Sequence, residues 1–376
     1  MKKLLWLAVA AGLQVVSLSA ANAADYQIGG LFPLSGPNAT YGDVFQAGAN
    51  LATDHINADK MLSGKLSIRY EDSQGLPQPG VVGMTKLVNV DQVPYVLSAF
   101  TGVSKAVAPI GARSQVVAIN GGGVGPDLAT LGDYFWNVIP LVNLEVKAVV
   151  PYLVKEQGYD KIVLLYVDDP LGQAVVTELG NALKANGGTL VDTMSVPTTA
   201  QQFSAVAAKL RAADAKAIYM ASYGAQQIQI VKQLRDNGVK TPIITYSAYG
   251  VPDALALPES EGLLYTAQSV DYASPDPVTK RFVEDFKAKV GRTPTAYNVN
   301  YYNAVRLFGL LAASLEKKGM KVTGESLLAE RKATKTFDLV GGTVSFQANG
   351  TLVAPIQIYA IKGGAATPVK TVKVDG

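Results

Sequence analysis

The strongest constraint on the fold is a regular alternation of short β-rich runs with helical segments, which the chain goes through twice. After most of the β-rich runs, apolar residues recur every three or four positions, as on one face of a helix. Strands separated by helices form parallel sheets covered on both faces. The sequence therefore predicts an α/β fold with two doubly wound, Rossmann-like lobes. The predicted strands are residues 26–32, 66–70, 94–99 and 116–120 in the first set and 161–167, 190–196, 217–221, 242–246 and 262–267 in the second.

The last quarter of the chain does not fit a third set. Residues 277–361 hold three predicted helices and two predicted strands, so we expect the chain to cross back between the two lobes. Three crossings form a hinge that can open and close. The predicted crossings lie near 140–141, 267–269 and 355–357, which assigns 24–140 plus 269–356 to the N-terminal lobe and 141–268 plus 357–376 to the C-terminal lobe.

The first 23 residues have the pattern of a secretory signal peptide. Lys2 and Lys3 precede an apolar stretch, and Ala21-Asn22-Ala23 offers small residues at the positions that signal peptidase needs. The apolar stretch of roughly 13 residues is too short for a membrane-spanning helix. We expect cleavage before Ala24 and a periplasmic location. The chain has no cysteine, which excludes disulfides and a lipid anchor at the cleavage site.

Composition and motifs argue against an enzyme and against bound cofactors or metals. The 33 Lys and Arg residues nearly balance 30 Asp and Glu residues, which does not favour a nucleic acid partner. His55 is the single histidine, so two-histidine zinc motifs are impossible. The run that starts at Gly121 resembles a dinucleotide fingerprint but has Pro126 in place of its last glycine. The acidic pairs Glu71-Asp72 and Asp168-Asp169 each follow a predicted strand and are expected to be solvated or capping.

Glycines and tyrosines mark a candidate binding site. Gly102 and Gly121–Gly123 follow strand ends, where open α/β sheets bind ligands. Exposed backbone N–H groups at such turns bind anions; the alternative is a pair of tight turns needed for packing alone. The 18 tyrosines, against two tryptophans, suit the walls of a cleft for an apolar ligand. Those at predicted loop or element ends are Tyr41, Tyr223, Tyr246, Tyr249 and Tyr297.

The opening of the mature chain resembles a known family. Leu31-Phe32-Pro33-Leu34-Ser35-Gly36-Pro37, Tyr41-Gly42, Ala47-Gly48-Ala49 and Asp54-His55-Ile56-Asn57 look like the start of type I periplasmic binding proteins. More narrowly, the chain is similar to the leucine/isoleucine/valine-binding family of ABC importers. This resemblance implies two lobes, closure around a solute and delivery to permease subunits in the inner membrane. A monomer is the simplest expectation for the oligomeric state, and we expect no cofactor.

The resemblance also implies positions for the ligand. In amino-acid binders of this family, hydroxyls and backbone N–H groups after two N-lobe strands hold the ligand carboxylate. The matching positions here read Phe100-Thr101-Gly102 and Gly122-Gly123-Val124, so that Gly102 and Val124 stand where the family has a serine and a threonine. Tyr41, Tyr223 and Tyr297 match aromatic wall positions, Leu171 replaces a frequent tyrosine, and the Tyr246–Tyr249 loop is expected to close over the ligand.

The largest departure concerns the acidic residue that pairs with the α-ammonium of an amino acid. The family resemblance places it in the loop Ser247-Ala248-Tyr249-Gly250, at about Ala248, and no acid follows until Asp253. A buried ammonium without a counter-charge costs roughly 3–5 kcal/mol. The sequence therefore predicts a ligand without an α-amine, an aromatic or other apolar carboxylate. Asp253 or Asp169 could still overturn this argument by entering the cleft.

Three other functions stay open at this stage. A branched-chain or aromatic amino-acid binder of the same importer class is the first. A periplasmic ligand sensor and a periplasmic hydrolase are the others; turnover would reveal the hydrolase, and a neighbouring kinase gene would favour the sensor.

Overall fold

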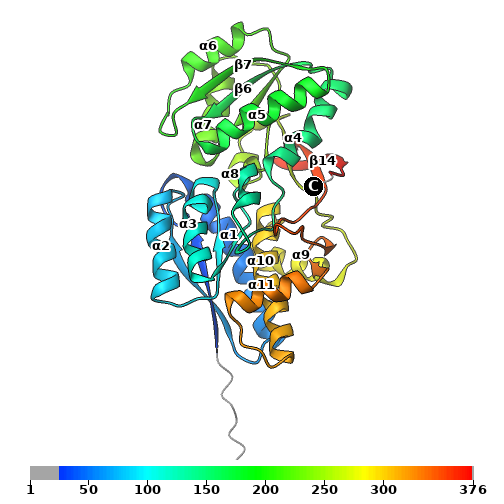
Figure 1. Ribbon diagram of the computed structural model, residues 1–376. Helices are drawn as coiled ribbons and strands as arrows, with labels where there is room; N and C mark the ends of the chain where they lie inside the picture. Colours follow the sequence, from blue (N-terminus) through cyan, green and yellow to red (C-terminus); the bar gives the residue numbers. More distant parts are fainter. Residues whose placement is uncertain (1–24, 375–376) are drawn as a thin grey trace, which may run out of the picture.

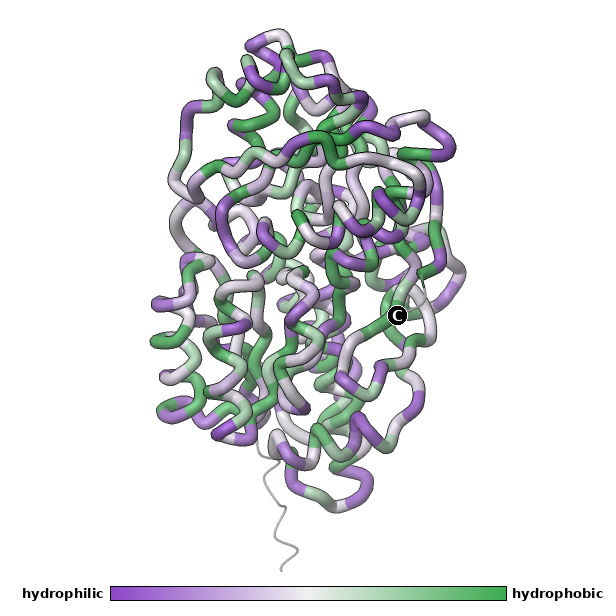
Figure 2. The backbone as a smooth tube through the Cα atoms, turned by 45° about the horizontal axis from the view of Figure 1, so that its top comes forward, coloured by the Kyte–Doolittle hydropathy of each residue, from purple (hydrophilic) through white to green (hydrophobic). Residues whose placement is uncertain are grey.

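The structure is a computed structural model that describes residues 25–374, and it consists of two α/β lobes stacked end to end (Figure 1). The predicted signal peptide and its cleavage before Ala24 lie outside the described residues. Within residues 25–374, no helix has the length and apolar character needed to cross a membrane. Figure 2 shows hydrophilic and hydrophobic residues alternating along the outer helices, as expected for helices with one buried face.

The N-terminal lobe is built on a five-stranded parallel sheet with the order β2-β1-β3-β4-β5. Side chains on the two faces of this sheet belong to different hydrophobic clusters: Ile28 of β1 lies in one cluster and Leu31 in the other. Both faces are therefore buried, as parallel sheets require. The strands are β1 (Tyr26–Phe32), β2 (Leu66–Asp72), β3 (Tyr95–Ser98), β4 (Val117–Asn120) and β5 (Phe135–Asn137).

Helices cover both faces of this sheet. One face is covered by α2 and α3, which pack together, and the other by α1 and α10, which come from distant parts of the chain (Figure 1). Helix α9 packs beside α1, and α11 beside α10. The helices are α1 (Ala39–Ala58), α2 (Pro77–Asn89), α3 (Thr101–Ser114), α9 (Pro277–Val290), α10 (Ala296–Lys317) and α11 (Gly324–Ala333).

The C-terminal lobe has a seven-stranded sheet with the order β14-β13-β10-β9-β8-β6-β7. Strands β6 to β10 are parallel, while β13 is antiparallel to both β10 and β14. The strands are β6 (Lys161–Val167), β7 (Thr189–Val196), β8 (Ala217–Ala221), β9 (Ile243–Thr245), β10 (Leu264–Gln268), β13 (Ile356–Lys362) and β14 (Ala365–Val372), and the helices are α4 (Val142–Pro151), α5 (Pro170–Ala185), α6 (Ser204–Ala212), α7 (Gly224–Asp236) and α8 (Pro252–Leu255).

The chain passes between the two sheets three times. It leaves the N-terminal sheet after β5, returns to the N-terminal lobe after β10, and enters the C-terminal sheet again at β13. The fold is therefore the predicted pair of doubly wound lobes with a three-crossing hinge. The boundaries at residues 140, 268 and 356 remain our proposal.

Some elements differ from the sequence prediction. The predicted strand at 340–346 is instead a small hairpin of β11 (Phe337–Leu339) and β12 (Gly342–Val344). Its turn contains Gly341 and Gly342, whose φ angles of 99° and 113° interrupt an extended strand. Strands β5 and β14 were not predicted.

Candidate binding site between the lobes

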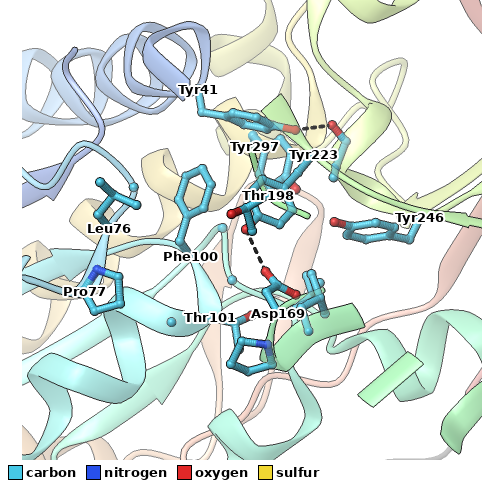
Figure 3. A pocket seen from close by; sticks show the side chains of 18 residues that line it. Tyr41, Leu76, Pro77, Phe100, Thr101, Asp169, Thr198, Tyr223, Tyr246 and Tyr297 are labelled. Carbon is cyan, nitrogen blue, oxygen red and sulfur yellow. Dashed lines mark hydrogen bonds between the residues drawn. The ribbon is translucent and has the colours of Figure 1, made fainter. Parts of the chain in front are cut away.

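A cavity of about 260 Å³ lies between the lobes, where loops at the carboxyl ends of strands from both sheets face each other (Figure 3). Its N-lobe wall comes from loops after β2, β3 and β4 and from α1 and α10. Its C-lobe wall comes from loops after β6, β7, β8 and β9. The predicted site residues that line it are Tyr41, Phe100, Thr101, Gly102, Gly122, Gly123, Val124, Leu171, Tyr223, Tyr246, Ala248 and Tyr297.

Tyr249 is the predicted site residue that does not line this cavity. Its side chain is fully buried, and its hydroxyl forms a 2.7 Å hydrogen bond with the hydroxyl of Ser260. The three-residue turn Ser247–Tyr249 is a 3₁₀ helix, in which successive side chains point about 120° apart. Ala248 therefore faces the cavity, while Tyr249 points into the C-lobe core.

The N-terminus of α3 forms one wall and carries the strongest features for binding an anion. Its first helical hydrogen bond runs from Ser104 N–H to Phe100 O, so the N–H groups of residues 101–103 precede the helical ladder. This end of a helix carries a partial positive charge. The Thr101 hydroxyl accepts a 3.0 Å hydrogen bond from Gly125 N–H and keeps its own proton available as a donor. Phe100 has a φ of 64°, a strained backbone at the site itself.

The glycine loop after β4 differs from the expected anion cradle. Gly122 and Gly123 line the cavity, but their N–H groups donate to Asn120 Oδ1 at 3.2 and 2.6 Å. A Cβ on Gly122 would lie 2.9 Å from the ring of Phe45, and one on Gly123 would lie 2.9 Å from the backbone of Phe100. Close packing accounts for these glycines, and the free donors of this wall come from α3.

Aromatic side chains from both lobes line the cavity, namely Tyr41, Phe100, Tyr223, Tyr246 and Tyr297. Phe100 meets Tyr41 and Tyr223 edge to face, with ring centroids 5.5 and 5.6 Å apart. Tyr41 meets Tyr297 in the same way at 5.8 Å. Because Tyr223 belongs to the C-lobe and Phe100 to the N-lobe, one aromatic cluster spans the gap between the lobes.

The hydroxyl of Tyr41 joins the lobes directly. It donates to Ala248 O at 2.7 Å and accepts from Gly224 N–H at 3.3 Å and from the Gln227 amide at 3.1 Å. At the cavity rim, Thr40 donates to Asp253 at 3.1 Å. The lobes are therefore closed on each other, and Asp253 lies outside the set of lining residues.

Asp169 is the one acidic residue among the described residues that line the cavity. It caps α5 by accepting from Gly172 N–H at 2.8 Å, and its other oxygen accepts from the Tyr223 hydroxyl at 2.7 Å (Figure 3). Burial raises the pKa of Asp169 above its ordinary value, although both hydrogen bonds act in the opposite direction. From the sequence, Asp169 and Asp253 are the acids that could supply a counter-charge to an α-ammonium. Of these two, Asp169 lines the cavity.

Sequence reasoning missed several lining residues. Asp169 is expected to be solvated or capping; it does cap a helix, and it is also a half-buried part of the cavity wall. The other missed residues share a sequence feature that could have identified them, because each follows the carboxyl end of a predicted strand. The lining residues absent from the predicted set are Gly75, Leu76, Pro77, Asp169, Pro170 and Thr198.

Metal binding and histidine chemistry have no support at this site. Within residues 25–374, no group of three His, Asp or Glu side chains is arranged to hold a metal ion. His55 lies elsewhere, with its ring nitrogens 2.8 Å from the Tyr302 hydroxyl and 3.0 Å from Asp285.

Two α/β lobes that close on an aromatic cavity, with a helix N-terminus in its wall, define a bilobed ligand-binding protein of the hinge-closing class. The sequence model of the periplasmic binding protein family matches residues 25–366. The chain therefore belongs to this family, as a type I periplasmic binding protein of the leucine/isoleucine/valine-binding group.

Curated relatives and solved structures agree with this assignment. Leu/Ile/Val-binding protein homolog 3 of Brucella melitensis is 25% identical over 345 residues, covering 90% of this chain and 92% of that protein. The substrate-binding protein LivJ of Streptococcus pneumoniae, solved with isoleucine, superposes with a TM-score of 0.85 at 21% identity, covering 93% of this chain and 100% of that one. A solute-binding protein of R. palustris, solved with benzoate, superposes with a TM-score of 0.82 at 17% identity, covering 93% and 96%.

Family membership fixes the general role. The chain is a periplasmic binding protein, and its family consists of solute-binding proteins rather than enzymes. The two solved structures are named as the substrate-binding protein of an amino-acid transporter and the solute-binding protein of an ABC transporter.

Proposed function

We propose that this protein binds a small carboxylate without an α-amine, with an aromatic or other apolar body, and presents it to the permease subunits of an ABC importer. The observation that carries the proposal is the N-terminus of α3 with the Thr101 hydroxyl, facing a cavity whose other walls are largely aromatic. Free N–H donors at a helix N-terminus favour an anionic group. The carboxylate would lie there.

The size of the cavity agrees with a small ligand. Its volume of about 260 Å³ is close to the lower limit of roughly 300 Å³ for pockets that hold drug-sized molecules. Closure would bring Tyr223 and Tyr246 of the C-lobe over a ligand already held by the N-lobe. The Tyr41 hydroxyl would then stabilise the closed form that the permease receives.

The absence of an α-amine is proposed from the C-lobe wall. Ala248 lines the cavity at the position where the family resemblance places an acid, and its carbonyl oxygen is already held by Tyr41 and Gln227. An apolar methyl group offers no counter-charge to an ammonium. The benzoate complex of the R. palustris relative shows that this fold accommodates such acids.

Asp169 favours a second candidate, an amino-acid binder. A carboxylate has about four acceptor positions, and Gly172 and Tyr223 occupy two of them, so Asp169 retains capacity to pair with an ammonium. The isoleucine complex of the LivJ relative illustrates such a ligand on this fold.

Calorimetric titration with matched acids separates the two candidates. Phenylalanine is compared with 3-phenylpropanoate, and leucine with 4-methyl-2-oxopentanoate, on the mature protein and on Asp169→Asn. We expect the amine-free acids to bind and the amino acids to bind at least 100-fold more weakly, with Asp169→Asn changing the affinity for the amine-free acids by less than tenfold. Tight binding of leucine or phenylalanine that Asp169→Asn abolishes would replace our proposal with the amino-acid candidate.

A further inference from the structure

The hydroxyl of Tyr246 is a buried polar group that forms no hydrogen bond with the described residues. Tyr246 follows β9, is 1% exposed and lines the cavity. In Figure 3 the hydroxyl points into the cavity, toward Tyr223, Tyr297 and Asp169.

Two other tyrosines of the cavity have protein partners for their hydroxyls. Tyr41 bonds to Ala248, Gly224 and Gln227, and Tyr223 bonds to Asp169. Buried hydroxyls are nearly always hydrogen-bonded, because an unmade bond leaves the cost of removing the group from water uncompensated. Because Tyr246 also lines the cavity, we expect the partner of its hydroxyl to be a ligand atom or a water molecule there.

The chemistry of the phenol narrows the ligand group. Burial raises the pKa of Tyr246 well above its ordinary value, and the nearby Tyr41, Tyr297 and Asp169 act in the same direction. The hydroxyl therefore stays neutral and provides no counter-charge for an ammonium. It does provide a hydrogen-bond donor to a keto oxygen, and both a donor and an acceptor to a hydroxyl group.

We infer that the ligand carries a second oxygen function, keto or hydroxyl, in addition to its carboxylate, and that Tyr246 binds this oxygen. The ligand class is then the oxo- and hydroxy-substituted carboxylic acids, and unsubstituted apolar acids are weaker ligands. This inference rests on the proposed function, because the carboxylate at α3 positions the rest of the molecule. Tyr246 would then determine the specificity for ligands with this oxygen substituent.

A titration cycle tests the inference. The ligands are 3-phenylpropanoate with its 2-oxo and 2-hydroxy derivatives, and benzoate with 4-hydroxybenzoate; the two series distinguish an oxygen next to the carboxylate from one at the far end. The unmodified mature protein should bind at least one oxygenated acid roughly tenfold or more tightly than its unsubstituted partner. In Tyr246→Phe that preference should fall to about one, with little change for the unsubstituted acid.

Tyr219→Phe is the matched control. The Tyr219 hydroxyl is also buried and lacks a partner among the described residues, but Tyr219 lies on β8 and does not line the cavity. It should keep the preference of the unmodified protein. Far-UV circular dichroism and the melting temperature verify that both variants fold.

Each other result is decisive. If the unmodified protein binds the unsubstituted acids as tightly as the oxygenated ones, the inference is wrong, whether or not Tyr246→Phe folds, and water fills the position. An equal loss for all acids in Tyr246→Phe also overturns it, since Tyr246 then acts through packing. Both outcomes leave the proposed carboxylate function intact. Failure of every acid to bind overturns both proposals.

Discussion

Among single residues, Tyr41 makes the most direct connection between the lobes, and its hydroxyl gives a testable contribution to closure. Tyr41→Phe keeps the ring but removes the bonds to Ala248 and Gly224 and one of the two made by Gln227. We expect the closed arrangement to lose about 1–3 kcal/mol. A ligand that binds the closed form would then bind roughly 5- to 100-fold more weakly in calorimetric titration.

Tyr95→Phe is the control for this prediction. The Tyr95 hydroxyl is equally buried and donates to Ala304 O at 2.9 Å, a bond within the N-lobe. This variant should lose stability but not ligand affinity. Equal losses of affinity in the two variants would show that the lobe-to-lobe bonds of Tyr41 do not contribute to closure.

For single residues, the sequence predicted which residues line the cavity better than it predicted which donors and charges they present. Tyr223 and Tyr246 lie at one edge of the C-lobe sheet because the carboxyl ends of its parallel strands share that edge, and Gly102 lies at the matching edge of the N-lobe sheet; a sequence pattern reveals both edges. By contrast, the N–H groups of Gly122 and Gly123 donate to Asn120 Oδ1, in a loop conformation that no residue spacing records. The inward position of Asp169 depends on its hydrogen bonds to Gly172 and Tyr223, which the local sequence pattern does not record.

At the scale of elements, the N-terminus of α3 gives the sharpest prediction. A Cβ on Gly102 would meet Pro77 at an ordinary 3.5 Å, so a small side chain fits. Gly102→Asp would place a negative charge at the positive end of the helix, which stabilises the helix by about 0.3–1 kcal/mol but repels a carboxylate ligand. We expect binding of the best carboxylate to weaken at least 100-fold while the melting temperature is unchanged or higher.

Gly102→Asn separates charge from size in this experiment. It has nearly the same shape as the aspartate and no charge, so it should retain most of the affinity. If both substitutions abolish binding equally, the loss is steric, and the anion site at α3 is not supported.

The elements that the sequence missed have physical reasons. Strand β5 has three residues, too few to show a period. Strand β14 is half exposed and contains two alanines and Pro368, which weakens its pattern. The pair Gly363-Gly364 after β13 could have indicated this strand, because two glycines with positive φ form a hairpin turn.

For the whole molecule, the repeated alternation of strands and helices was enough to predict two lobes, because parallel strands need crossover helices. It also predicted a hinge, because a chain that returns to a completed sheet must cross between the lobes.

The alternation did not reveal which contacts stabilise the segments that cross between the lobes. Glu145, in the first turn of α4 after the first crossing, is 1% exposed. It accepts hydrogen bonds from Ser247 N–H at 2.9 Å, the Ser247 hydroxyl at 2.7 Å and the Thr266 hydroxyl at 2.5 Å.

This buried carboxyl group makes the stability of the whole molecule depend on pH. Burial raises the pKa of Glu145 from 4.5 to about 7, outweighing the three hydrogen bonds, which lower it. Below pH 4.5 the group is protonated in both folded and unfolded chains. Between pH 4.5 and 7 the unfolded chain loses this proton first, so stability should fall by about 3 kcal/mol over that interval and then remain level.

Glu145→Gln removes this titration and provides the test. Urea unfolding midpoints are measured from pH 4 to 8 for the unmodified protein, for Glu145→Gln and for Glu284→Gln, which changes an exposed acid on α9. The difference in stability between Glu145→Gln and the unmodified protein should move in favour of glutamine as pH rises from 4.5 to 7, while Glu284→Gln shows no such change. A difference that stays constant across that interval would mean that Glu145 is ionised in the folded protein throughout. The three hydrogen bonds, rather than burial, would then determine its charge, and α4 would be anchored to the C-lobe by a buried anion.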